Sequence, residues 1–297
     1  MRTDYLFDER EIALKNPLQV LRDCGGYYEV VKDIDGTRLS PLVGYAGKYP
    51  VIDDSSSEQD QSSQPKQLQY VGDVYCNFAK AETYPMVRRV WADILMGKMM
   101  IRGPMRAQLF GLHIRPNLVC LAAPMGGILF ADSLAERLGC RVVFAEKRIT
   151  KQATDSSREE SVLELNRHEI PPGSQVLIVE DVCNNFSTTQ ELVDLVEKSR
   201  NTVIGIACEL NRSKYKNKVP ITIKSNESRV MRPEELDVYS LVYLEIPEYR
   251  QDDPFVAEDV KAGKVVWKPK DKEQWAKLKD SMTKGEHLRY LSGLTEE

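Results

Sequence analysis

The sequence predicts an α/β fold built on a doubly wound, mostly parallel sheet. Along the middle of the chain, short apolar runs alternate with segments whose apolar residues recur at the helical spacing of three and four. The apolar runs show no polar–apolar alternation, so we expect strands that are covered on both faces. The predicted strands are residues 117–122, 141–144, 175–179 and 202–208. The predicted helices are residues 85–100, 128–138 and 188–198.

Each predicted helix carries one apolar face. The first helix begins at Pro85, and proline is favoured at the first helical position. The second helix stops before Gly139, a common residue just after a helix end. The side chains expected to face the core are Val87, Val90, Trp91, Ile94, Leu95, Ile128, Ala131, Leu134, Ala135, Leu138, Leu192, Leu195 and Val196.

The segments on either side of this core are predicted to form smaller parts. Residues 27–31 and 39–43 flank an Asp35-Gly36 turn, which predicts a small antiparallel pair. A further strand is expected within residues 70–78. We therefore expect an N-terminal subdomain at 1–84 with a flexible polar loop at 53–67, an α/β core at 85–244 and a C-terminal extension at 245–297. We expect Trp267, Trp275 and Leu278 to dock the extension on the body.

Composition disfavours several classes of protein. The net charge of −4 disfavours a general binder of nucleic acid or of anionic membranes. No apolar run approaches the roughly 20 residues of a membrane-spanning helix, and residues 1–11 lack the apolar centre of a secretory leader. The six cysteines are scattered without a C-x-x-C pair, so we expect free thiols and a cytoplasmic protein. His113, His168 and His287 match no metal-ligand spacing.

The segment VLIVEDVCNNFSTT, residues 176–189, is the strongest chemical signal. An apolar strand leads into two adjacent acids, Glu180 and Asp181, and a polar loop then opens a helix. Free amides at a helix start favour an anion, and the polar side chains Asn184, Asn185, Ser187, Thr188 and Thr189 add donors. Carboxylates beside an anion cradle suit a ribose phosphate. The alternative, solvated strand-end acids followed by an ordinary helix cap, stays open.

This segment resembles the phosphoribosyl pyrophosphate-binding motif of type I phosphoribosyltransferases. Residues 123–128 (APMGGI) resemble the pyrophosphate loop of that family, and residues 144–147 (FAEK) resemble the segment that brings a lysine to the pyrophosphate. Residues 147–173 stand where orotate phosphoribosyltransferases keep a mobile catalytic loop, and residues 24–49 where they keep a hood over the base.

The resemblance implies a role for each matched residue. Asp181 and Glu180 would hold the ribose hydroxyls, and residues 184–189 the 5′-phosphate. Met125, Gly126, Gly127 and Lys147 would face the pyrophosphate. Lys151 is the candidate catalytic lysine of the mobile loop, acting across the interface of a homodimer, with Arg148 and His168 as further loop contacts. Mg²⁺ would be held through substrate oxygens rather than by side chains alone, with Asp181 as the one side chain that could contribute.

The sequence departs from the family motif at residues 184–187, where Asn-Asn-Phe-Ser replaces threonines and glycines. We expect Phe186 to avoid positive φ and to crowd the anion unless it turns away. The resemblance implies transfer of a phosphoribosyl group to a nucleobase, with orotate and pyrimidine biosynthesis as the first choice. A non-catalytic nucleotide sensor on the same fold stays open. A dinucleotide-binding domain is disfavoured, because no G-x-G-x-x-G follows a strand.

Overall fold

The computed structural model describes residues 8–51, 66–102, 117–151, 160–224 and 231–294. Contacts divide the chain into two compact units. The α/β unit contains Met1–Cys24 and Phe78–Glu245, and the small β unit contains Gly25–Asn77 and Ile246–Glu297. The boundaries of these units differ from those expected at residues 84 and 244, because residues 1–24 group with the α/β unit and residues 246–297 group with residues 25–77. In the described part of the chain, no helix combines the length and apolar character needed to cross a bilayer.

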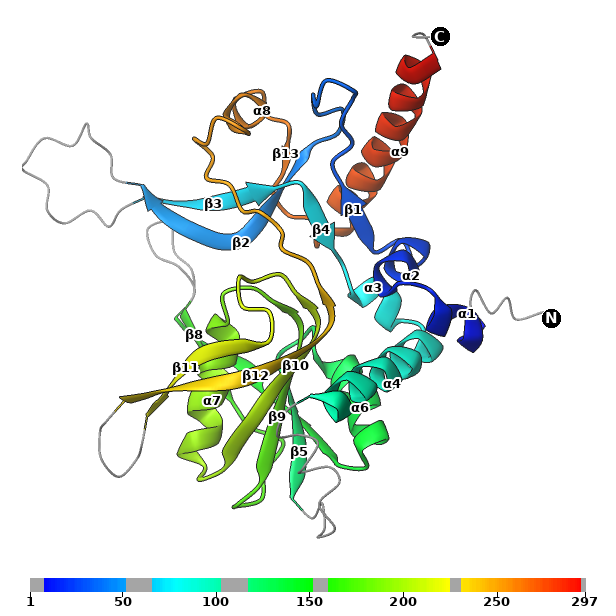
Figure 1. Cartoon of the computed structure of the whole chain (residues 1–297). Coiled ribbons are helices and arrows are strands. Elements are labelled where there is room, and N and C mark those ends of the chain that lie inside the picture. The colour runs from blue at the N-terminus through cyan, green and yellow to red at the C-terminus, as the bar shows by residue number, and fades with distance from the viewer. Residues whose placement is uncertain (1–7, 52–65, 103–116, 152–159, 225–230, 295–297) are drawn as a thin grey trace, which may run out of the picture. The chain divides into compact units, whose positions relative to one another are not determined.

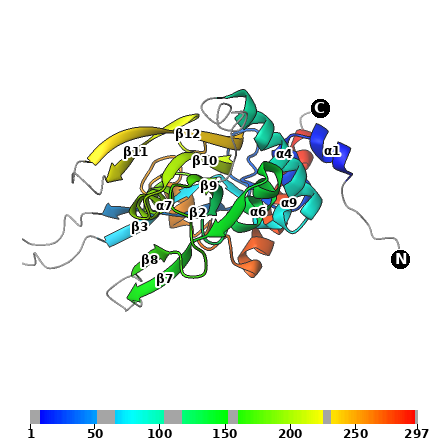
Figure 2. The same ribbon diagram turned by 90° about the horizontal axis from the view of Figure 1, so that it is seen from below.

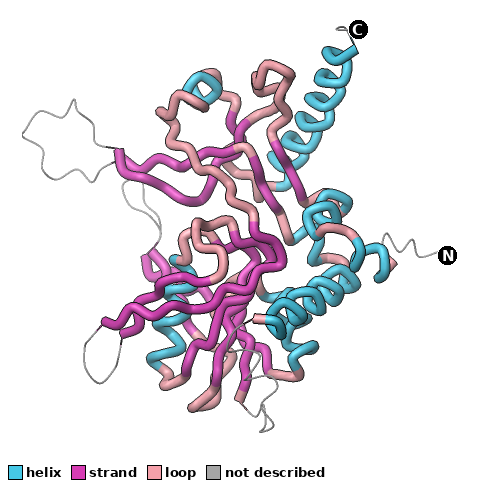
Figure 3. The backbone as a smooth tube through the Cα atoms, in the orientation of Figure 1, coloured by secondary structure: helices cyan, strands magenta, loops and turns pink. Residues whose placement is uncertain are grey.

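A six-stranded sheet forms the centre of the α/β unit (Figure 3). Its strands are β5 (Leu118–Ala122), β6 (Arg141–Phe144), β9 (Gln175–Cys183), β10 (Thr202–Asn211), β11 (Lys218–Lys224) and β12 (Met231–Tyr243). The order is β11-β12-β10-β9-β5-β6, and every pair is parallel except β11 with β12. This confirms the predicted mostly parallel sheet. Strands β11 and β12 extend it beyond the four strands that were predicted.

Helices cover both faces of this sheet, as a doubly wound fold requires (Figures 1 and 2). The helices of the unit are α1 (Glu9–Leu14), α2 (Pro17–Asp23), α3 (Ala79–Glu82), α4 (Pro85–Ile101), α6 (Ile128–Leu138) and α7 (Ser187–Lys198). The three predicted helices correspond to α4, α6 and α7. Helix α4 starts at Pro85 as expected, and α6 ends before Gly139, whose φ of 62° is left-handed.

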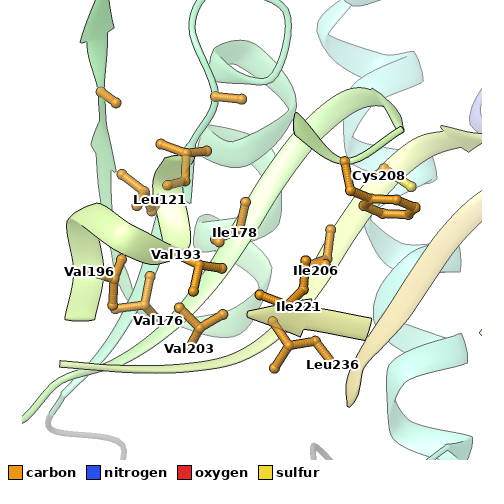
Figure 4. Packing of buried hydrophobic residues seen from close by; sticks show 14 of the residues in the cluster. Leu121, Val176, Ile178, Val193, Val196, Val203, Ile206, Cys208, Ile221 and Leu236 are labelled. Atoms are coloured by element: carbon orange, nitrogen blue, oxygen red, sulfur yellow. The ribbon is translucent and has the colours of Figure 1, made fainter. Parts of the chain in front are cut away.

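Apolar side chains of the central strands pack against α7 (Figure 4). Val176 and Ile178 of β9 are fully buried, as are Val193 and Val196 of α7. Because side chains alternate along a strand, the intervening residues of β9 point to the opposite face. Each fully buried side chain of this kind contributes about 1.5–3 kcal/mol to folding. This core holds the carboxyl end of β9 in a defined position beside the first turn of α7.

The stretch after β6, where the mobile loop is expected, contains a β-hairpin. Residues Glu146–Lys151 form β7 and Glu160–Glu164 form β8, and the two strands pair antiparallel. Leu163 and Leu165 pack against the core cluster beside α7, which explains why the hairpin base is built into the unit. The intervening residues 152–159, part of the predicted mobile loop, lie outside the described residues.

The small β unit contains β1 (Tyr27–Glu29), β2 (Leu42–Val51), β3 (Lys66–Gly72), β4 (Val74–Cys76), α8 (Ala257–Lys261), β13 (Val265–Val266) and α9 (Lys272–Leu294). The predicted pairing of 27–31 with 39–43 is wrong. Strand β1 pairs with β4, and β2 pairs with β3 and β13. The Asp35-Gly36 turn does form, with Gly36 at φ 83°, but a single bridge between Lys32 and Arg38 closes it. The predicted flexible loop at 53–67 lies largely outside the described residues.

The C-terminal segment is part of the small β unit rather than a peripheral tail. Strand β13 adds to β2 in parallel, and a Cβ atom on Gly44 of β2 would lie 2.7 Å from the Trp267 ring. In α9, Leu278 is fully buried, and the Trp275 ring lies 5.9 Å from the Tyr75 ring. The three apolar residues expected to dock the extension therefore bind it to residues from the N-terminal part of the chain.

Candidate active site

Two of the predicted site segments meet at the carboxyl end of β9. Loop 123–127 is anchored to this strand because the Ala123 amide donates to the Val179 carbonyl at 2.8 Å. A Cβ atom on Gly126 would lie only 2.2 Å from Oδ2 of Asp181, and one on Gly127 would lie 2.4 Å from the Val179 carbonyl oxygen. Only glycine allows this approach, which explains the Gly-Gly pair in physical terms. The loop backbone thus lies directly against the second acid of the motif.

The two acids of the motif project from opposite faces of β9 and are both half-buried. Glu180 points toward α7, where its Oε2 accepts a hydrogen bond from the Thr189 hydroxyl at 3.1 Å. Asp181 lies beside Gly126, and its Oδ1 accepts from the Val182 amide at 2.8 Å. The acids therefore lie at the same edge of the sheet, the edge at which doubly wound folds bind ligands, and each is oriented by a different neighbour.

The expectation that Phe186 avoids positive φ is wrong. Its φ is 59° and its ψ is 21°, in the left-handed region, and it forms the N-cap of α7. The side chain turns away from the loop into the core, where it is 5% exposed and its ring centre lies 6.3 Å from that of Tyr215. The backbone conformation costs about 1–2 kcal/mol, but burial of the ring is worth more. The aromatic ring therefore does not crowd the first turn of α7.

The first turn of α7 has one amide already satisfied. Oδ1 of Asn185 accepts hydrogen bonds from the Ser187 amide at 3.1 Å and from the Ser187 hydroxyl at 2.9 Å. Helix geometry leaves the Thr188 and Thr189 amides without an intrahelical acceptor. The hydroxyl of Thr189 is engaged with Glu180, whereas the side chain of Thr188 is half-buried. Asn184 is also half-buried and lies between the acids and this turn.

The basic residues of the predicted site lie on the β7–β8 hairpin and just after it. Lys147 is exposed on β7. Arg148 pairs with Glu164 at 2.6 Å, so its charge is shared with an acid of the same hairpin. His168 stacks edge-on against Phe144 with ring centres 4.6 Å apart. Lys151 ends β7 opposite Glu160, and its side chain lies outside the described residues. Met125 is 83% exposed in loop 123–127.

Two acids near the site were not identified from the sequence. Glu82 ends α3, and Glu209 lies in β10; both are buried. Glu209 follows directly on the predicted strand 202–208, in a run of otherwise apolar residues, and this is the signal that could have revealed it. Burial raises the pKa of Glu82 to about 7 and holds the pKa of Glu209 well above its ordinary value. Each acid therefore keeps its proton to a higher pH than an exposed carboxyl group does.

The thiol beside the acid pair is not poised for nucleophilic chemistry. Contact with Cys208 and burial raise the pKa of Cys183 well above its ordinary value, and its Sγ lies 3.7 Å from Oε2 of Glu180. A thiol that remains protonated is a poor nucleophile. Within the described residues, no group of three or more His, Cys, Asp or Glu side chains could by itself hold a metal ion.

A family model described as the phosphoribosyl transferase domain matches residues 112–237. This range contains loop 123–127, strand β9 and helix α7. The segment that contains the candidate site is therefore similar to the phosphoribosyl transferase domain, and it carries the mostly parallel α/β sheet described above.

Curated relatives carry more particular names. Orotate phosphoribosyltransferase of Thermoanaerobacter sp. (strain X514) is 33% identical over 108 residues, which are 36% of this chain and 51% of that protein. Adenine phosphoribosyltransferase of Thermobifida fusca is 32% identical over 87 residues, 27% of this chain and 49% of that protein. This chain thus spans about half the length of the curated relatives it matches. A solved adenine phosphoribosyltransferase from Thermoanaerobacter pseudethanolicus is 18% identical with a TM-score of 0.38, over 58% of this chain and 90% of that one.

Proposed function

We propose that this protein transfers the phosphoribosyl group of phosphoribosyl pyrophosphate to a nucleobase. The observation that carries the proposal is the packing of Gly126 against Asp181, with a Cβ position only 2.2 Å from the carboxylate. This packing brings the backbone of the glycine loop, an acid at the strand end and the first turn of α7 to one edge of the sheet. Pyrophosphate, ribose and 5′-phosphate need three such adjacent features. The match of residues 112–237 to the phosphoribosyl transferase domain supports the same reading.

Each residue has a proposed task that follows from its chemistry. Glu180 and Asp181 accept hydrogen bonds from the ribose hydroxyls and favour the positive charge that develops on the ribose ring. The amides of Thr188 and Thr189, with Asn184, Asn185 and Ser187, bind the 5′-phosphate. Met125, Gly126 and Gly127 contribute the loop that faces the pyrophosphate, together with Lys147. Lys151 neutralises the departing pyrophosphate, with Arg148 and His168 as further contacts from the hairpin.

Mg²⁺ is part of this proposal. When bound through substrate oxygens, it would supply positive charge that neutralises the pyrophosphate. The donor set of the site fits a cation held mainly through substrate oxygens, because no described cluster of three or more His, Cys, Asp or Glu side chains could hold one alone. The chain itself contributes the carboxylate edge of β9 and the amides of the two loops.

We propose orotate as the nucleobase and a homodimer as the functional form. Curated relatives named orotate phosphoribosyltransferase support the base, whereas a relative named adenine phosphoribosyltransferase makes adenine the first competitor. A panel of orotate, uracil, adenine, guanine and hypoxanthine, assayed for pyrophosphate release, decides between these bases.

Sedimentation equilibrium tests the dimer. A second experiment mixes inactive Asp181→Asn chains with inactive Lys151→Ala chains. If Lys151 acts across the dimer interface, each mixed dimer contains one competent site and activity returns.

The reaction is tested first by calorimetry with phosphoribosyl pyrophosphate and Mg²⁺, and then by turnover of the base panel. We expect Asp181→Asn and Lys151→Ala each to lower kcat by about 10²-fold or more, because each removes a charge that stabilises the transition state. Normal turnover by Lys151→Ala contradicts the assignment of that lysine. Failure of the wild-type protein to bind phosphoribosyl pyrophosphate contradicts the whole proposal.

The loop packing is tested by Gly126→Ala. The new methyl group has no room beside Asp181, so we expect binding of phosphoribosyl pyrophosphate to weaken at least about tenfold, a loss of about 1.4 kcal/mol. Gly97→Ala is the matched control, because its Cβ position meets no atom within 4 Å and alanine is the better helix former in α4. Equal affinity in the two variants contradicts the proposed role of loop 123–127.

A non-catalytic nucleotide sensor is the second candidate, and one observation favours it. Asn185 already satisfies the Ser187 amide, which removes one donor from the anion cradle. A sensor binds phosphoribosyl pyrophosphate or a nucleoside monophosphate but releases no pyrophosphate with any base of the panel.

A further inference from the structure

Three acidic side chains from three elements converge at the carboxyl end of β9. The register between β9 and β10 sets Glu209 beside Asp181, and neighbouring side chains at matched positions of parallel strands point to the same face. Glu82 approaches from the end of α3, and its carboxyl group lies within hydrogen-bonding reach of that of Glu209. Asp181, the acid that packs against Gly126, is therefore backed by two further acids.

Glu209 is completely buried, and Glu82 is 4% exposed. Within the described chain, no N–H or hydroxyl group donates a hydrogen bond to either carboxyl oxygen of Glu209 or to Oε1 of Glu82. Buried acceptors without a donor cost on the order of 1–3 kcal/mol each, and more when they are charged. The one group that can supply a proton to Glu209 from the described chain is thus the carboxyl group of Glu82.

Two carboxyl groups in contact form a hydrogen bond only if one of them carries a proton. Two ionised carboxylates at this depth would add mutual repulsion to the loss of hydration. A pair that shares one proton satisfies an oxygen on each side and carries a single negative charge. Burial raises the pKa of both acids, which agrees with a retained proton.

The surrounding charges favour the same arrangement. Asp181 faces the pair from β9, Cys208 lies beside it on β10, and Arg88 faces Glu82 from α4. Asp181 adds repulsion, whereas Arg88 attracts a negative charge on Glu82. The remaining charge of the pair is therefore drawn toward α4 and away from Asp181. Repulsion by that charge keeps the Asp181 carboxylate on the side of Gly126.

We propose that Glu82 and Glu209 form a buried carboxyl pair that shares one proton and acts as a pair of positioning residues for Asp181. The pair does not touch substrate; it acts by keeping the Asp181 carboxylate against loop 123–127. The effect of the pair on ligand binding rests on the proposed function, whereas the existence of the pair does not.

The shared proton is tested by infrared difference spectroscopy of the full chain at neutral pH. We expect the carbonyl band of a protonated carboxylic acid in the wild-type protein and its loss or shift in both Glu82→Gln and Glu209→Gln. Glu286→Gln, an exposed acid of α9, is the control and leaves the band unchanged. Absence of a protonated band that responds to either buried substitution overturns the pair, whatever the protein binds.

The positioning role is tested with a conservative single substitution and an apolar double substitution. In Glu209→Gln the amide donates to Glu82 in place of the shared proton, so one hydrogen bond and one charge remain. In the double variant Glu82→Leu/Glu209→Leu both are lost, and replacing both members of a buried polar pair by apolar side chains of similar volume tends to preserve the fold or stabilise it. We expect affinity for phosphoribosyl pyrophosphate within about twofold of the wild type for Gln and at least about tenfold weaker for the double variant, with the thermal midpoint of the double variant not lowered.

Crystal structures of the same variants provide a readout that needs no ligand. We expect Asp181 to keep its contact with Gly126 in Glu209→Gln and to leave it in the double variant Glu82→Leu/Glu209→Leu. Unchanged placement of Asp181 in the double variant overturns the positioning role. If the wild-type protein fails to bind phosphoribosyl pyrophosphate, the proposed function fails, but the spectra and structures still decide the pair.

Discussion

Phe186 shows how a single residue resolves a conflict between backbone and side chain. A loop that binds phosphate closely usually needs glycine, yet here a phenylalanine adopts φ 59°. The residue can do so because its ring is buried among core side chains beside Tyr215. The local sequence indicates only the backbone cost of positive φ, about 1–2 kcal/mol. The compensating burial of the ring depends on residues that are far away in the sequence.

The balance at Phe186 predicts opposite outcomes at two positive-φ residues. Phe186→Gly relieves about 1–2 kcal/mol of strain but removes a buried ring worth about 3–5 kcal/mol, so we expect a net loss of about 2 kcal/mol. Arg200 has φ 57° and is exposed, so Arg200→Gly relieves strain without loss of packing and gains about 1 kcal/mol. Urea denaturation measures both, and destabilisation by Arg200→Gly contradicts the strain argument.

The buried acids predict a pH dependence of stability. The pKa of Glu82 rises from 4.5 to about 7 on folding, so the folded state holds the proton more tightly. The stabilisation is complete below pH 4.5 and is lost as the pH rises through about 7. Because a tenfold change in proton affinity is worth about 1.4 kcal/mol, the loss is on the order of 3 kcal/mol. Urea denaturation between these pH values should show a steeper fall in the wild type than in Glu82→Gln, which keeps only the contribution of Glu209; equal slopes contradict the assignment.

At the scale of elements, regular helices and buried strands were predictable, and their extents were less so. Residues 128–138 and 141–144 were predicted with the boundaries that α6 and β6 have. Strand β9 was expected to end at residue 179, where polarity begins, yet it continues to Cys183. The reason is that β9 pairs with β10 through backbone groups, and this pairing does not depend on the polarity of the Glu180 and Asp181 side chains. For the same reason Glu209 was not assigned to a strand: the apolar run of β10 ends at Cys208, whereas the backbone pairing continues.

The side chain of Gln190 links helix α7 to the edge strand β11 by two hydrogen bonds. Gln190 donates to the Thr222 carbonyl at 2.7 Å and accepts from the Thr222 amide at 3.0 Å. Gln190→Ala leaves both backbone groups without these partners, so we expect a loss of about 1–3 kcal/mol and faster hydrogen exchange in β11. Gln19→Ala removes an exposed hydrogen bond to Asp23 and is the control, with little effect expected. Exchange rates in β11 equal to those of the wild type contradict the attachment.

At the scale of the whole molecule, the chain builds two units from interleaved segments. The small β unit joins residues 25–77 to residues 246–297, about 170 positions further along the chain. Arg38 illustrates this, because it binds Asp73 at 3.0 Å and Asp259 at 3.2 Å. Local patterns cannot reveal such pairings, and residues 245–297 were therefore predicted as a separate extension.

Truncation tests this interleaving. A chain that ends at Glu245 loses β13, Trp267 and Leu278, so strand β2 is left with one partner and an uncovered apolar surface. We expect the small β unit to unfold while the α/β unit stays folded, because the latter keeps all its strands. Limited proteolysis should then cut within residues 27–49 in the truncated chain but not in the full chain. Equal resistance of the two chains contradicts the division into units.

The sequence by itself determined the parallel sheet, its covering helices and the acids at the end of β9, because these follow from periodicity, burial and turn chemistry within short segments. Only the tertiary structure decided that Phe186 turns into the core, that Glu82 and Glu209 meet behind Asp181, and that the two ends of the chain share one small unit. Each of these depends on contacts between residues distant in sequence. The free energy of such contacts is set by three-dimensional packing, which no local pattern contains.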